Sequence, residues 1–181
     1  MKLFTLLLAA VLLSNISYTQ ITKHKWLLGG QVSFDHTKSK TELTQSSSTV
    51  FQLKPQLGYF AIDKLAGGIQ LDYVQAKTKT DITIKAASLG IGPFARYYML
   101  DPRSKINIVT DARIAFYGTS TNLSGHRQKY RAYSAAAGPV LFLNQSIGIE
   151  LLMGYSGSKD DATTRNGFRT SLGVQAHWGR R

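Results

Sequence analysis

The chain has 181 residues, a formal net charge of +12 and no cysteine. The lack of cysteine excludes disulfides, thiolate metal sites and a lipid anchor on an N-terminal cysteine. The lysines and arginines are dispersed, with no basic helix, so we expect anionic lipid and not nucleic acid to be the partner of this charge.

The chain begins with the pattern of a secretory signal peptide. Lys2 precedes an almost wholly apolar run at 3–13, and small or polar residues follow at 14–20. The run is too short to cross a membrane as a helix, so we expect cleavage near Thr19. Residues 1–19 are thus predicted to be a signal peptide. Residues 20–181 are predicted to be one domain, since no linker or shift of composition divides them.

Eight segments downstream alternate apolar and polar side chains, as strands with one apolar face do. In chain order they are residues 26–34, 50–60, 68–73, 88–98, 106–116, 133–141, 147–156 and 167–178. We expect polar loops at 37–48, 77–81, 118–128 and 157–165, and short turns at 61–65, 99–104 and 144–145. A strand of about ten residues can cross a bilayer when tilted, and the last segment is long enough to do so.

These elements predict an all-β fold, namely an eight-stranded antiparallel up-and-down transmembrane β-barrel. After residue 20 no apolar run is long enough for a transmembrane helix. Pro55, Pro93 and Pro139 recur on the apolar faces of alternate strands. Because proline removes a ladder donor, we expect bulges or water-reachable positions there.

The apolar face is expected to point outward, because it ends in aromatic residues at two levels, as in the interfacial girdles of membrane barrels. One level comprises Trp26, Tyr59, Tyr97 and Trp178, and the other comprises Phe34, Phe51, Tyr73, Phe116, Tyr155 and Phe168. The reverse arrangement, with an apolar interior, is that of a soluble calycin-like barrel that binds an apolar ligand.

The polar face is expected to fill a narrow lumen, because eight strands leave room only for side chains. Its charged members are Lys54, Asp72, Arg96, Asp111, Arg113, Glu150 and Arg169. Buried charges need partners, so we expect Lys54 to lie near Asp72, and Asp111 with Arg113 to lie near Arg96. Such a network would plug the lumen and disfavours a pore.

Four stretches carry a family resemblance together with the predicted signal peptide. They are Leu57-Gly58-Tyr59-Phe60, the turn at 62–65, the run at 90–93 and the terminal strand at 172–178. With these stretches the chain resembles the small eight-stranded outer-membrane barrels of the OmpA/OmpX type, especially those of Bacteroidetes-like bacteria. The resemblance implies a monomer in the bacterial outer membrane, in contact with its lipid and lipopolysaccharide.

The resemblance also implies insertion by the barrel-assembly machinery. Family members usually end on an aromatic residue that resembles a recognition signal for that machinery. Here Gly179, Arg180 and Arg181 follow Trp178, so the chain departs from the family pattern at its last residues.

The function favoured by the sequence is a non-enzymatic barrel that stabilises the envelope or presents its loops. An alternative is a lipid-modifying enzyme that uses His36 with Asp35, or His126 with Ser124. His24, His36, His126 and His177 are scattered without ligand spacing, so we expect no metal, no cofactor and no catalytic residue.

Overall fold

The computed structural model describes residues 21–41, 44–79, 83–121, 128–159 and 164–179. The expected signal peptide and its cleavage site lie outside these residues. The described chain forms eight strands: β1 (Trp26–Thr41), β2 (Thr44–Ile62), β3 (Leu65–Lys79), β4 (Thr83–Tyr98), β5 (Ile106–Thr121), β6 (Gln128–Phe142), β7 (Ile147–Lys159) and β8 (Thr164–Trp178).

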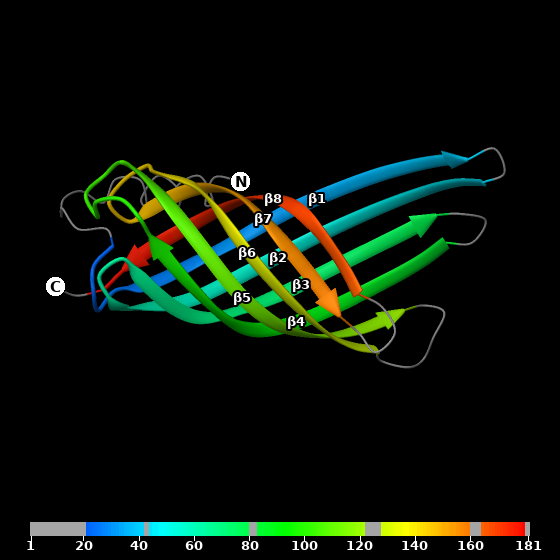
Figure 1. The fold of residues 1–181 in the computed structure, drawn as a ribbon, viewed down its shortest axis with the longest axis horizontal. Helices are drawn as coiled ribbons and strands as arrows, with labels where there is room; N and C mark the ends of the chain where they lie inside the picture. Colours follow the sequence, from blue (N-terminus) through cyan, green and yellow to red (C-terminus); the bar gives the residue numbers. More distant parts are fainter. Residues whose placement is uncertain (1–20, 42–43, 80–82, 122–127, 160–163, 180–181) are drawn as a thin grey trace, which may run out of the picture.

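Each strand pairs antiparallel with the next, and β1 pairs with β8, so the sheet closes into a barrel (Figure 1). The predicted all-β, eight-stranded antiparallel up-and-down barrel is confirmed. The described residues contain no helix of the length and hydropathy needed to span a membrane.

The closing ladder between β1 and β8 is short. It runs from Trp26↔Trp178 to Val32↔Leu172, whereas the β1–β2 ladder runs from Trp26↔Tyr59 to Thr41↔Thr44. Among the described residues, the part of β1 beyond Val32 is therefore paired on one side only.

The alternation of each strand separates an apolar exterior from a mixed interior. In β4, Ile91, Ala95 and Tyr97 are exposed on the outside, while Phe94 and Arg96 are buried inside. Large apolar side chains occupy the outer positions of the other strands as well. This apolar exterior does not match a calycin-like barrel, whose exterior is polar.

An apolar cluster fills the interior at the end where the turns 63–64, 99–105 and 143–146 lie, here called the turn end. Its largest members, Phe60, Phe94, Tyr98 and Phe142, are at most 4% exposed. The rings of Phe60, Tyr98 and Phe142 surround His177 with centroids 5.3–5.8 Å away. Aromatic side chains thus pack together in the lumen at this end, which the sequence analysis did not predict.

The bounds of the four predicted polar loops are wrong, because strands continue into each of them. Strand β1 reaches Thr41 and β2 begins at Thr44, and the other three hairpins extend in the same way. Serine and threonine pair across neighbouring strands there, as between the hydroxyls of Ser88 and Thr119 at 2.7 Å. Polar side chains on both faces look like loop in the sequence, yet they suit an antiparallel ladder that stands in water.

The hairpins project to different heights at the end opposite the turns, here called the hairpin end. The β1–β2 hairpin extends farthest and the β7–β8 hairpin is much shorter (Figure 1). At the other end, the predicted turn at 61–65 is shorter than expected, because only Asp63 and Lys64 separate β2 from β3, with Lys64 at φ 67°.

Of the bulges or water-reachable positions expected at Pro55, Pro93 and Pro139, the ladders show no bulge, and all three prolines are exposed on the outer face. Beside Pro55 the β2–β3 ladder stops at Leu53↔Tyr73 and resumes at Gln56↔Gln70 in the same register. The β4–β5 and β6–β7 ladders skip Pro93 and Pro139 in the same manner. Each ring removes one donor, and the long ladder on both sides holds the register.

Two of these prolines follow a glycine that allows the next strand to come close. A Cβ built on Gly92 would lie 1.9 Å from the carbonyl oxygen of Ile114, and one on Gly138 would lie 1.9 Å from that of Leu151. No side chain fits at either position unless the neighbouring backbone moves.

We therefore expect Gly92→Ala to lower the free energy of unfolding by about 1–3 kcal/mol, because the added methyl group pushes β5 away from β4. Gly118→Ala is the control, since nothing lies within 4 Å of its Cβ position, and it should change stability by less than about 0.5 kcal/mol. Equilibrium urea unfolding of the refolded barrel measures both. Equal effects would contradict the close approach.

Candidate functional site

The seven predicted charged residues all lie on the inner side of the barrel. Lys54, Asp72, Arg96, Asp111 and Glu150 are buried, while Arg113 and Arg169 are half-buried. Six different strands supply them, and the two-residue period of each strand directs them inward. The structure groups them into two clusters, one around Arg96 and one around Asp72.

Arg96 is the centre of the first cluster and is fully buried. Its Nε donates to Asp111 Oδ2 at 3.0 Å, and its Nη1 and Nη2 donate to Glu150 Oε2 and Oε1 at 2.8 and 3.2 Å. Nη1 also donates to Gln175 Oε1 at 3.0 Å. This fork binds Glu150 with two parallel bonds, a geometry that only arginine offers.

Neutral polar side chains complete this cluster. The amide oxygen of Gln56 can accept from Arg96 Nη1 and Nη2 at 3.1 and 3.2 Å. Gln31 Nε2 donates to Glu150 at 3.3 Å, and the Tyr98 hydroxyl donates to Gln175. The Arg96 cluster therefore joins β1, β2, β4, β5, β7 and β8 across the lumen, directly beside the apolar cluster of the turn end.

Asp72 is the centre of the second cluster, nearer the hairpin end. It accepts hydrogen bonds from the Tyr117 hydroxyl and from Gln70 Nε2. Arg113 Nη1 lies 3.7 Å from Asp72 Oδ1, and Arg113 Nε donates to Ser134 at 2.7 Å. Each oxygen of the Asp72 carboxylate thus accepts a hydrogen bond from a neutral donor. Its ion pair with Arg113 is long.

Lys54 does not pair as expected. The ion pairs within the described chain join Arg96 with Asp111 and Glu150, and Arg113 with Asp72, but none includes Lys54. The position is 4% exposed. Arg113 and Arg169 repel its charge, while Asp72 and Asp111 attract it from beyond contact distance. The two-residue period of β2 predicts that Lys54 points into the barrel. It does not predict which side chain contacts Lys54.

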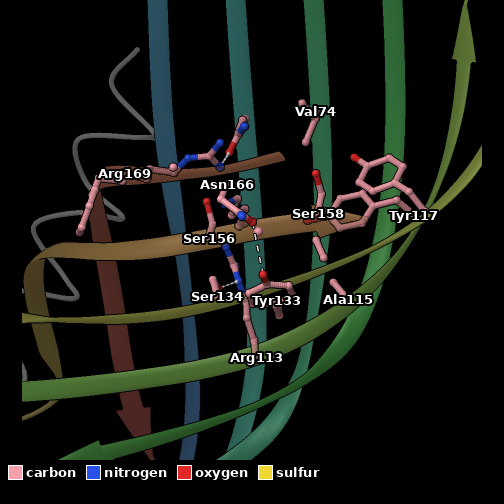
Figure 2. A pocket seen from close by; sticks show the side chains of 17 residues that line it. Val74, Arg113, Ala115, Tyr117, Tyr133, Ser134, Ser156, Ser158, Asn166 and Arg169 are labelled. Carbon is pink, nitrogen blue, oxygen red and sulfur yellow. Dashed lines mark hydrogen bonds between the residues drawn. The ribbon is translucent and has the colours of Figure 1, made fainter. Parts of the chain in front are cut away.

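A cavity of about 320 Å³ lies beside the second cluster, within the hairpin half of the barrel (Figure 2). Lys54, Arg113 and Arg169 line it, together with hydroxyls such as that of Ser134. Arg169 Nη1 donates to Gln52. No carboxylate is among the described residues that line this cavity.

The ten predicted girdle residues lie on the outside of the barrel. At the turn end, Trp26 packs edge-on against Tyr59 with ring centroids 5.2 Å apart, and Trp178 is the register partner of Trp26. Tyr97 lies on the exposed outer face of β4. Nearer the hairpin end lie Phe34, Phe51, Tyr73, Phe116, Tyr155 and Phe168.

The histidines considered for catalysis and metal binding are only partly described. His24 Nδ1 is hydrogen-bonded to the Tyr59 hydroxyl at 2.8 Å, and His177 is buried in the apolar cluster. The side chains of Asp35 and His36, and residues 124 and 126, lie outside the described parts. Within the described parts, no group of three or more histidine, aspartate or glutamate side chains is arranged to hold a metal.

Sequence reasoning missed several neutral residues of the interior. Gln31, Gln56, Gln175, Tyr98 and Tyr117 all hydrogen-bond to the charged residues or to one another. Each lies an even number of residues from an inward position of its own strand, so the two-residue period marks them. The sequence analysis selected charged residues only, so it did not select these neutral ones.

No protein-family model and no curated protein sequence matches the chain. The fold resembles the crystal structure of Neisserial surface protein A, with TM-score 0.59, 19% identity, 84% of this chain covered and 96% of that chain. It also resembles the outer membrane protein OprG from Pseudomonas aeruginosa, with TM-score 0.55, 11% identity, 91% of this chain covered and 100% of that chain. The chain thus shares the fold of small eight-stranded outer-membrane barrels.

Arg96→Met should lower the free energy of unfolding by about 3–5 kcal/mol, because it leaves Glu150 and Asp111 buried without their partner. Arg103→Met, in the exposed β4–β5 turn, should cost less than about 0.5 kcal/mol. Adding Glu150→Gln to Arg96→Met should cost less than the two changes cost separately, because one of the two orphaned charges is gone. Urea unfolding followed by tryptophan fluorescence measures the cycle. An Arg96→Met loss no larger than that of Arg103→Met would contradict the central role of Arg96.

Proposed function

We propose that the chain is a non-enzymatic β-barrel of the bacterial outer membrane, with a lumen plugged by its own side chains. In this role it supports the envelope and presents its long hairpins at the cell surface. The observation that carries the proposal is the fully buried Arg96 cluster, which joins strands on opposite sides of the barrel and lies beside the aromatic packing of the turn end.

The outer surface supports a membrane location. Leu28, Ile69, Leu71, Ile91 and Leu172 are each at least half exposed on a continuous sheet. In water so large an apolar surface would drive aggregation, whereas lipid accepts it. The closed ladder also satisfies the backbone without water, which is the condition for crossing a bilayer with strands.

The lengths of the connections at the two ends of the barrel support an orientation in the outer membrane. Outer-membrane barrels have short turns on the periplasmic side and longer segments outside the cell. By this rule the turns 63–64, 99–105 and 143–146 face the periplasm and the extended hairpins face outward. The net charge of +12 also favours contact with anionic lipopolysaccharide. Assembly as a monomer by the barrel-assembly machinery belongs to the same proposal.

Planar-bilayer recordings should show little or no steady conductance from the inserted barrel, because the Arg96 cluster and the aromatic packing leave no continuous water path. Heat-modifiable migration of the same preparation controls for folding, since a closed barrel resists mild detergent and runs differently before boiling. Stable, single-channel steps from a folded preparation would contradict the plugged lumen.

Shortening the β1–β2 hairpin separates surface presentation from envelope support. A variant in which Asn-Gly replaces residues 38–47 retains the pair Thr37↔Ser48, and Asn-Gly favours the tight turn that joins two strands. In a strain without the gene, this variant should restore resistance to detergent like the full chain, but should lose adhesion or partner binding at the surface. If the shortened barrel restores both properties, the hairpin has no presenting role.

The lipids of the same strains test the enzymatic alternative. A non-enzymatic barrel leaves the acylation of lipid A and phospholipid unchanged when the gene is removed. A modified lipid that disappears with the gene and returns with the full chain would overturn the proposal in favour of a lipid-modifying enzyme.

A further inference from the structure

The cavity at the hairpin half of the barrel holds an excess of positive charge. Lys54, Arg113 and Arg169 line it, and the described lining contains no carboxylate. Asp72, the acid in contact with this group, reaches Arg113 at 3.7 Å. Asp111, which pairs with Arg96, also lies near these cations. The seven charged residues of the interior are four cations and three acids, so one positive charge is left for a ligand to neutralise.

Two of these cations have unused hydrogen-bonding capacity. Lys54 is 4% exposed and belongs to none of the ion pairs among the described residues. Arg113 Nη1 is buried and has no hydrogen-bond partner there. A buried donor without a partner is costly, and the cost is recovered when an acceptor binds it.

The carboxylates nearest the cavity already hold hydrogen bonds. Asp72 accepts from Tyr117 and Gln70, and the Arg96 cluster uses Asp111 and Glu150. Gln70 Oε1 is a buried acceptor without a partner, but Gln70 is not among the residues that line the cavity. The described lining thus supplies cationic donors and no carboxylate, which is the donor set of an anion site.

We propose that this cavity binds the phosphate group of a small soluble solute, with Lys54, Arg113 and Arg169 as its cationic ligands. A phosphate group offers three acceptor oxygens to these three cationic side chains, one more than a single carboxylate does. The planar forks of the two arginines suit tetrahedral oxyanions. The cavity volume of about 320 Å³ leaves space for a substituent beside the phosphate.

A soluble solute fits this position better than a lipid headgroup. The cationic side chains project into the barrel and not toward the apolar exterior that lipid would cover. The Arg96 cluster lies beneath the cavity, so the site retains its ligand and does not pass it on. This binding is independent of the role proposed for the hairpins, and either can fail without the other.

The test uses the full barrel, refolded in zwitterionic detergent and titrated with inorganic phosphate by calorimetry, with sodium chloride at equal ionic strength as the reference. Wild-type protein should bind phosphate with saturation, and phosphate should raise its Tm by mass action. Lys54→Met should weaken phosphate binding by about tenfold or more. Lys105→Met is the matched control, because Lys105 is exposed in the β4–β5 turn, and it should bind phosphate like the wild type.

Stability without phosphate distinguishes a binding residue from a structural one. Because Lys54 belongs to none of the ion pairs among the described residues, Lys54→Met should leave the Tm unchanged or raise it. Arg169→Gln provides a second variant, with the same expected loss of binding. Absence of saturable binding in the wild type, or equal affinity in Lys54→Met, Arg169→Gln and Lys105→Met, would overturn the proposal.

The source of the phosphate is decided by a competition between two ligands. A soluble hexose phosphate should compete with inorganic phosphate, while lipid A in mixed micelles should not. Competition by lipid A alone would overturn the assignment to a soluble solute.

Discussion

The ion pair between Arg96 and Glu150 is the interaction on which the interior depends. Arg96 comes from β4 and Glu150 from β7, so the pair crosses the lumen and does not link neighbouring strands. A guanidinium with no exposed surface pays a large desolvation cost, which only a complete set of acceptors offsets. Asp111, Gln175 and Gln56 supply the rest of that set. Around Arg96 the polar interior is thus a connected network of charged and amide side chains and not a row of separate charges.

The network and the aromatic packing divide the lumen into two regions of different chemistry. Toward the turns, apolar rings pack beside the charge pairs and lower the local dielectric, which strengthens these pairs. Toward the hairpins, three cations line a cavity whose described lining has no carboxylate. The same eight strands produce both regions, because aromatic and amide side chains gather at inward positions near the turns and Lys54, Arg113 and Arg169 occupy inward positions farther from them.

The period of two residues predicted the closed barrel, the outward aromatics and the inward direction of all seven charges. It could not predict the partner of Lys54, because neighbours on the inner wall depend on the shear of the barrel and on side-chain length. The sequence did not predict the extended hairpins, for another reason. Residues 44–49 are serine, threonine and glutamine, whose lack of apolar alternation is the usual sign of a loop. Bulges or water-reachable positions were expected at Pro55, Pro93 and Pro139. No bulge forms, because the paired residues on both sides of each ring outweigh one missing donor.

The short seam between β1 and β8 leaves part of a sheet edge open. Beyond Val32, β1 has a described neighbour on the β2 side only, so its backbone groups face water along the tallest hairpin. An open edge invites a strand from another molecule, which natural proteins discourage by placing lysines along it. The upper part of this seam is therefore the place on the barrel wall where a strand of a second molecule would find backbone groups that β8 does not pair.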